Sequence, residues 1–216
     1  MTVDVVGLGH CAIDYLGVLP RYPRLDSKEE LLQFSIQGGG PTATAIVTLA
    51  TFGASTAFVG KVADDDFGHF IRRGLEENGV NVDHLVVEPD RISPFSFIAI
   101  EERTGNRNIF WTRGNVSPLT LEELDLSILD GAQFLLVDGH QMKVQIAAAQ
   151  RARERGITVV LDAGSLKEGM GDLVAYTDII IASERFVSEI CPVGELEDTL
   201  FELKRMGPPV AVVTLG

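Results

Sequence analysis

Four side chains follow apolar runs of the sequence, where they could bind a hydroxylated ligand. Asp14 stands alone after the first run, Asp138 and His140 follow a later one, and Asp162 follows the next. In an open parallel sheet, ligands bind at the carboxyl ends of the strands, so these residues are predicted to share one rim. A carboxylate can accept hydrogen bonds from two neighbouring hydroxyl groups, which suits a sugar. From spacing alone, a solvated loop acid is an equally good interpretation of Asp14.

Two glycine-rich segments could bring a ligand close to the backbone. Gly38-Gly39-Gly40 precedes Pro41 at the predicted start of a helix, whose free N–H groups can bind an anion. No Gly-Lys-Ser/Thr follows, so this segment is not a P-loop. Gly7-Leu8-Gly9-His10-Cys11-Ala12 matches the dinucleotide fingerprint, but prolines and a glycine in residues 13–23 prevent the helix that the fingerprint requires. We interpret this second segment as a tight strand exit, and an NAD-dependent oxidoreductase would rest on it alone.

Other polar clusters favour structural roles. The run Asp64-Asp65-Asp66 could hold a hard cation, but its place before an amphipathic helix favours a helix cap. The two cysteines, Cys11 and Cys191, lie in apolar surroundings without metal-type spacing, which is typical of free thiols in a reducing cytoplasm. The four histidines are scattered, so we predict no metal site held by the protein alone.

Composition restricts the classes of partner. The 216 residues carry a formal net charge of -13, which repels nucleic-acid phosphates and anionic membranes. An anionic ligand would therefore need a local cluster of Arg and Lys. The N-terminus has no basic region before its apolar residues, and no stretch approaches the roughly 20 apolar residues of a membrane span. We expect a cytoplasmic protein that binds neither nucleic acid nor membranes.

The elements that must position these residues alternate between strand and helix. A chain of this length can form one large α/β domain, and the alternation predicts a mostly parallel sheet covered on both faces. The predicted strands are Val3–Gly9, Ser55–Val59, Gln133–Asp138, Ile157–Leu161, Asp178–Ile181 and Val210–Leu215. The predicted helices are Thr42–Phe52, Asp65–Asn78, Lys143–Glu154, one that Ser183 caps, and Glu195–Met206. Residues 16–30 are predicted to be a loop.

One region breaks the alternation. Ser96–Glu101 and Arg107–Thr112 are strand-like and are joined by Thr104-Gly105-Asn106, which predicts a β-hairpin. With Leu31–Ile36 this hairpin could form a small antiparallel sheet, so residues 31–36 and 95–112 are the predicted strands of a lid. Arg113 follows the hairpin and could reach over the rim, although an isolated arginine is more often a surface charge.

Several of these segments, in this order, resemble the ribokinase-like (PfkB) family of carbohydrate kinases. The matching segments are Gln37-Gly38-Gly39-Gly40-Pro41-Thr42-Ala43-Thr44-Ala45, Phe58–Gly68, Val159–Ser165 and Val212–Gly216. Each motif is moderately specific, and four in the correct order are strongly specific. The resemblance implies a three-layer α/β/α sandwich with a β-sheet lid that often serves as a homodimer interface.

The resemblance also implies an activity and a set of site residues. The activity is transfer of the ATP γ-phosphate, with Mg²⁺, to a hydroxyl of a sugar or related small molecule. Carried over by position, the residues that would hold or cover the sugar are Asp14, Gly38, Gly39, Gly40, Phe97, Arg113 and His140. Those that would act on the nucleotide and the magnesium–phosphate network are Ser183, Glu184, Thr214 and Gly216.

Departures from the family pattern qualify this implication. Family members usually have Asn at the positions of Ala43 and Ser183, and ribokinase-type enzymes have Asn at the position of Ala12. The Gly-Ala-Gly-Asp motif that supplies the family's catalytic base would lie after Gly216. We therefore expect residues 1–216 to form a single domain that is incomplete at its C-terminus and inactive as a kinase alone. A non-catalytic sugar-binding or regulatory protein of the same fold is the alternative.

Overall fold

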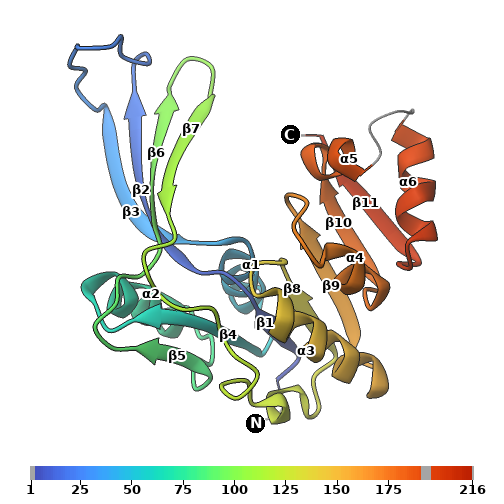
Figure 1. The fold of residues 1–216 in the computed structure, drawn as a ribbon. Coiled ribbons are helices and arrows are strands. Elements are labelled where there is room, and N and C mark those ends of the chain that lie inside the picture. The colour runs from blue at the N-terminus through green and yellow to red at the C-terminus, as the bar shows by residue number, and fades with distance from the viewer. Residues whose placement is uncertain (1–2, 191–195, 216) are drawn as a thin grey trace.

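The computed structural model describes residues 3–190 and 196–215, and its largest element is a parallel sheet (Figure 1). The seven strands lie in the order β11-β10-β9-β8-β1-β4-β5, and each neighbouring pair is parallel. Their bounds are β1 Val5–Leu8, β4 Thr56–Ala63, β5 Leu85–Glu88, β8 Phe134–Val137, β9 Thr158–Ala163, β10 Ile179–Ser183 and β11 Val210–Thr214. All carboxyl ends therefore meet at one edge, as the alternation predicted.

Helices cover both faces of this sheet. The first face packs on α1 (Pro41–Thr51) and α2 (Asp66–Glu77), through a core that includes Ile46, Phe58 and Ile71. The other face packs on four further helices: α3 Met142–Glu154, α4 Met170–Ala175, α5 Glu184–Ile190 and α6 Leu196–Arg205. Alternate residues of β1 face opposite layers, because Val5 belongs to the first core and Val6 to the second. The predicted three-layer α/β/α sandwich is confirmed.

A second sheet forms the lid and projects from the main domain (Figure 1). It contains four strands in the order β3-β2-β6-β7. Their bounds are β2 Ala12–Leu19, β3 Gln33–Gly39, β6 Phe95–Glu101 and β7 Arg107–Thr112. The predicted hairpin is confirmed as β6 and β7, which pair antiparallel.

Two expectations about the lid were wrong. Residues 16–19 are not a loop but the end of β2, which pairs with β3 and β6 on its two sides. The strand stops at Leu19, directly before Pro20, since a proline cannot donate to the ladder. The sheet is mixed rather than antiparallel, because β2 and β6 both leave the main domain in the same direction and pair parallel (Figure 1).

Local signals placed most other boundaries within a few residues. Asp65 caps α2 by accepting a hydrogen bond from the Gly68 N–H at 2.8 Å, which confirms the cap interpretation of that acidic run. Ser183 caps α5 by accepting from the Phe186 N–H at 3.1 Å. The strand β5 and the helix α4 were missed. Cys11 is a buried free thiol, whereas Cys191, Glu195 and Gly216 lie outside the described residues.

None of the helices in the described ranges is long and apolar enough to cross a bilayer.

Candidate functional site

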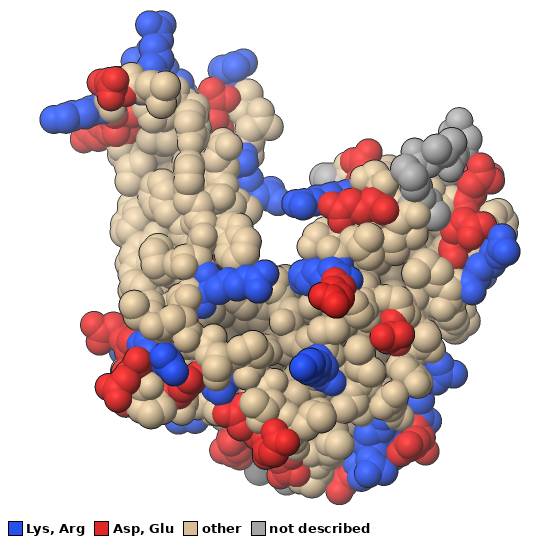
Figure 2. Space-filling model, in the orientation of Figure 1, with Lys and Arg blue, Asp and Glu red and all other residues tan. Residues whose placement is uncertain are grey.

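The main cavity lies between the carboxyl edge of the parallel sheet and the base of the lid, and its volume is about 430 Å³. Figure 2 shows the hollow between the lid and the main domain, with lysine and arginine side chains on its walls. We call one wall the sheet side, formed by Gly9, His10, Gly40 and His140. We call the facing wall the lid side, formed by Asp14, Ser96, Ile109, Trp111 and Arg113.

Glycines allow the sheet side to pack closely at two positions. A Cβ at Gly9 would lie 2.2 Å from Thr42 Oγ1 and 2.4 Å from Asp138 Oδ2. Gly40 has φ 98°, and a Cβ there would lie 2.4 Å from the His10 carbonyl oxygen. The interpretation of Gly9 as part of a tight strand exit is thus confirmed, because a side chain there would clash with Thr42 and Asp138, and a strand rather than a helix follows from Ala12. The Gly40 conformation begins α1 directly beside the cavity.

Asp138 joins three elements beneath the cavity. It is 2% exposed, and its carboxylate accepts hydrogen bonds from the His10 N–H, the Thr42 hydroxyl, the His140 N–H and Gln145 Nε2, at 2.7–3.0 Å. Burial opposes its ionisation, but the His140 ring and these hydrogen bonds outweigh burial and hold the pKa of Asp138 below its usual value. Asp138 therefore acts as a fixed anion that positions the ends of β1 and β8 and the start of α1.

The imidazole rings of His10 and His140 stack at the cavity surface. Their centroids are 4.7 Å apart and their planes are inclined by 18°. Burial lowers the pKa of both rings, against the opposing influence of Asp138, and that of His140 falls to about 4. Both imidazoles are therefore neutral at pH 7, and each offers one N–H donor and one acceptor nitrogen.

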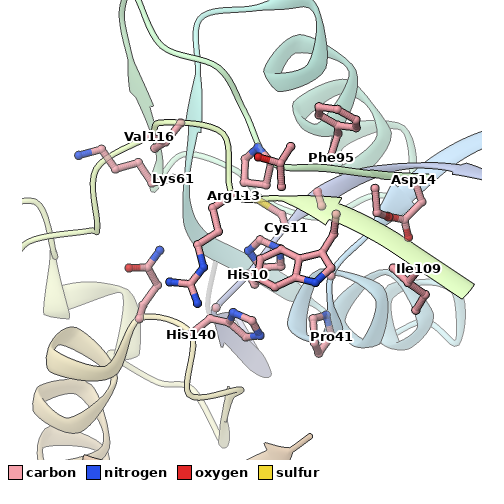
Figure 3. Close-up of a pocket in the computed structure, with 18 of the residues that line it drawn as sticks. His10, Cys11, Asp14, Pro41, Lys61, Phe95, Ile109, Arg113, Val116 and His140 are labelled. Atoms are coloured by element: carbon pink, nitrogen blue, oxygen red, sulfur yellow. The ribbon is translucent and has the colours of Figure 1, made fainter. Parts of the chain in front are cut away.

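The lid side carries a carboxylate and a guanidinium. The Ser96 hydroxyl donates a hydrogen bond to Asp14, which leaves further acceptor positions of that carboxylate open to the cavity. Gly39 makes this position possible, because a Cβ there would lie 2.1 Å from Asp14 Oδ2. Arg113 stacks over the face of Trp111, with its Cζ atom 5.6 Å from the ring centroid. Figure 3 shows the Arg113 guanidinium pointing toward His140.

A second cation, Lys61, also lines the cavity, but its charge is neutralised. Its side chain is 4% exposed, and Nζ lies 2.7 Å from Glu123 Oε1 and 3.6 Å from Glu88 Oε2. It also donates to the Ser117 hydroxyl at 2.9 Å. This network fixes the segment after Arg113 against β4.

The structure brings together some of the residues that the sequence suggested for the sugar. Asp14, Gly40, Arg113 and His140 line the main cavity. Gly38 and Gly39 line a separate space of about 290 Å³ between the lid and helices α1 and α2. Phe97 is not among the cavity-lining residues and instead contacts Phe110, with ring centroids 6.4 Å apart. Strand alternation explains this, since its neighbours Ser96 and Ile98 face the cavity.

Sequence reasoning missed His10 as a site residue. It lies directly after a predicted strand, and that position was the available signal. Nothing in the sequence indicated that Trp111 would hold Arg113 or that Thr42 and Gln145 would satisfy Asp138.

The residues suggested for the nucleotide lie farther along the same sheet edge. Ser183 ends β10 and is paired in register with Thr214 on β11, while Glu184 begins α5. These strands are separated from β8 by β9. The Ser183 hydroxyl donates to the Gly164 carbonyl at 2.9 Å, and Glu184 is exposed. None of the three lines the main cavity, and Gly216 lies outside the described residues.

Within residues 3–190 and 196–215, no three His, Cys, Asp or Glu side chains are grouped so that they could hold a metal ion.

Known proteins resemble both the sequence and the fold. The 5-dehydro-2-deoxygluconokinase of Geobacillus kaustophilus is 30% identical over 169 residues, which are 74% of this chain and 49% of that protein. The chain therefore spans about half the length of the curated relatives it matches. An Agrobacterium tumefaciens protein of known crystal structure is 23% identical in sequence to this chain. The two structures match with a TM-score of 0.90 over 100% of this chain and 71% of that chain.

A second solved structure has the same fold. It is the Arabidopsis thaliana ribokinase complexed with ribose and ATP, which is 20% identical with a TM-score of 0.82. The match covers 100% of this chain and 73% of the ribokinase chain. The model of the pfkB family carbohydrate kinases matches residues 3–216, and the chain therefore belongs to that family.

Proposed function

We propose that this chain is the sugar-binding part of an ATP-dependent kinase that phosphorylates a hydroxyl of a sugar or sugar-like small molecule. The observation that carries the proposal is Asp14, a carboxylate that faces the cavity between the lid and the sheet edge. Family membership supports the reaction class. The proposal treats residues 1–216 as one domain and the cytoplasm, where ATP is available, as its location.

Asp14 suits the role of a hydroxyl acceptor. Its bond from Ser96 fixes one oxygen, and the remaining lone pairs can accept hydrogen bonds from two neighbouring sugar hydroxyls. The apolar surfaces of Ile109 and Trp111 on the same wall can cover the less polar face of a sugar ring. This combination orients one hydroxyl and excludes water from it, which favours phosphoryl transfer over hydrolysis.

The carboxyl edge of β10 and β11 suits the nucleotide. Ser183, Glu184 and Thr214 present hydroxyl and carboxylate oxygens there, the ligand type that Mg²⁺ prefers. When bound, ATP with Mg²⁺ would supply the phosphoryl group and neutralise its charge. The solved ribokinase of the same fold is complexed with ribose and ATP, which supports a site for a sugar together with a nucleotide. The location of the catalytic base after Gly216 remains a prediction.

The test is sugar-dependent ADP release, measured in a coupled assay on the protein in the form that its natural source produces. The intact mass of that form establishes which residues it contains. We expect ADP release with at least one sugar of a panel of ketoses, aldoses and sugar acids. The D14N variant should weaken the binding of that sugar by roughly 10- to 100-fold, as expected for loss of a charge-assisted hydrogen bond. The control E102Q, on the lid tip, should not.

The outcomes separate the two candidate functions. Sugar binding that depends on Asp14, without any ADP release, would contradict the kinase proposal and favour a non-catalytic sugar-binding protein. ADP release that is unchanged in D14N would contradict the assigned role of Asp14.

The lid is also the proposed homodimer interface. Its outer strands expose Phe34, Ile36 and Phe110, each between 42% and 54%, on the face opposite to the cavity. Exposed apolar surface of this kind commonly marks a protein–protein contact. In light scattering coupled to gel filtration, we expect F34D to convert a dimer to a monomer. The control F52D changes an equally apolar residue, 83% exposed at the end of α1, and should leave the dimer intact. A wild-type monomer would contradict the interface.

A further inference from the structure

We propose that the sugar acceptor carries an anionic group, a carboxylate, sulfonate or phosphate, and that Arg113 binds it beside His10 and His140. This inference rests on the proposed function, because it names the class of the molecule that Asp14 holds by its hydroxyls. In Figure 3 the Arg113 guanidinium points away from Asp14 and toward His140. One molecule could therefore contact both residues through different ends.

The two cations that line the cavity, Lys61 and Arg113, differ in their surroundings. Lys61 has two carboxylates and a hydroxyl around its ammonium group, so its charge is already neutralised. Within the described residues, no carboxylate lies within 4.0 Å of the Arg113 guanidinium, which instead rests on the face of Trp111. A guanidinium has five N–H donors in a planar fork that matches carboxylate and phosphate oxygens. Arg113 is thus a held cation whose donors are available to a ligand.

The neighbouring groups favour an anion at this point. The stacked His10 and His140 rings are neutral at pH 7 and can each donate one N–H without requiring a counter-charge. Lys167 approaches from the connection between β9 and α4, with Nζ 3.3 Å from the Asp138 carbonyl oxygen. The nearby Asp138 carboxylate already accepts four hydrogen bonds, so it has little capacity left to accept from a ligand.

The negative charge of the whole chain bears on the role of Arg113. The chain has a formal net charge of -13, so the general field repels an anionic ligand. A free arginine that faces the cavity supplies a local positive charge against this field. A neutral sugar would gain little from this charge.

The anion could alternatively be the transferred phosphate of ATP. We assign it to the acceptor because Arg113 follows a lid strand on the Asp14 side of the cavity, whereas the proposed nucleotide residues lie on β10 and β11. Inorganic phosphate and ATP are therefore separate arms of the test.

The experiment uses Trp111 as its probe. The chain has one tryptophan, and it contacts Arg113, so its fluorescence reports on this site. The titrants are two matched pairs, D-gluconate with D-glucitol and fructose 1-phosphate with fructose, in which the members differ only by the anionic group. The variants are R113A, the milder R113Q, and R107A, which removes the same charge from an exposed position at the start of β7.

We expect the anionic member of at least one pair to bind about 10- to 100-fold more tightly than its neutral partner. R113A and R113Q should abolish that difference while leaving the neutral partner unchanged, and R107A should preserve it. Melting curves establish that each variant is folded.

Three results would overturn the inference. One is equal binding of both members of each pair, or no binding of any anionic probe. Another is an equal loss of affinity for the anionic and the neutral probes in R113A. The third is displacement of the anionic probe by ATP at matched concentrations, which would assign the site to the transferred phosphate, whereas displacement by inorganic phosphate alone would support an anion site at Arg113. ADP release with a neutral sugar would leave the proposed kinase function standing in each case.

Discussion

The two sides of the cavity are built on different principles. The sheet side rests on a buried carboxylate, Asp138, whose four hydrogen-bond donors come from the β1–β2 connection, α1, the β8–α3 connection and α3. The lid side has few buried groups, and Trp111 on it is 61% exposed. Its polar groups, Asp14 and Arg113, are held by single contacts with Ser96 and Trp111.

The two sides therefore differ in what their residues contribute: stability of the fold on the sheet side, and ligand binding on the lid side. Buried, fully satisfied polar groups fix a unique geometry, and removing one leaves its partners without a substitute. Exposed groups with one partner contribute little to folding and remain free to bind a ligand. We therefore expect substitutions on the sheet side to affect the free energy of unfolding, and those on the lid side to affect binding.

The largest expected effect is that of D138A. It removes the acceptor of four donors, although Gln145 Nε2 still donates to the Leu8 carbonyl, and each buried unsatisfied donor costs about 1–3 kcal/mol, so the free energy of unfolding should fall by roughly 3 kcal/mol. Chemical denaturation measures this loss. The control D172A removes an exposed carboxylate from α4 and should change stability by less than about 0.5 kcal/mol. Similar effects of the two variants would show that the sheet side is not held by Asp138.

An intermediate effect is expected at the junction of the two sides. In G39A the new methyl group would lie 2.1 Å from Asp14 Oδ2, so the carboxylate or β3 must move. Overpacking of this kind typically costs about 1–3 kcal/mol. It should also weaken sugar binding, which Trp111 fluorescence can follow.

The adjacent glycine supplies the control for this prediction. A Cβ at Gly38 meets nothing within 4 Å, so G38A should be nearly neutral in both measurements. If G38A and G39A weaken sugar binding equally, the close approach of Asp14 to the backbone is not what matters.

The smallest expected effect concerns pH and His140. Burial lowers the pKa of His140 to about 4 in the folded state, against about 6.5 when unfolded. The unfolded chain therefore binds this proton first as the pH falls. The stability contribution is complete above about pH 6.5 and is lost progressively down to about pH 4. Because His140 is partly exposed, we expect a shallow decline in the free energy of unfolding.

Denaturation between pH 7 and pH 5 measures this decline, before most carboxylates titrate. H140N should flatten it. An unchanged slope in H140N would show that His140 does not contribute to the pH dependence.

Several features of the fold follow from local sequence. Apolar runs, turn glycines and caps such as Asp65 and Ser183 act within a few residues, so they define helices and strands before any tertiary contact exists. Strand β2 was only partly predictable, because its end lies beside Pro20 and is stabilised by pairing with β3 and β6. The rule that ligands bind at the carboxyl ends of parallel strands predicted a shared rim for Asp14 and His140, and both line one cavity, whereas Arg113 was assigned to the site through the family resemblance.

The order of the elements, the family resemblance and the rim on which the polar residues lie could therefore be predicted from the sequence alone. Which cation can bind a ligand depends on tertiary packing. Lys61 donates a hydrogen bond to Glu123, 62 residues away in the chain, whereas Arg113 stacks on Trp111 and has no carboxylate partner among the described residues. Tertiary packing also decided that His10 joins the site, since its N–H reaches Asp138 across 128 residues. Such partners are brought together by packing between distant elements, and no local pattern encodes which of them will meet.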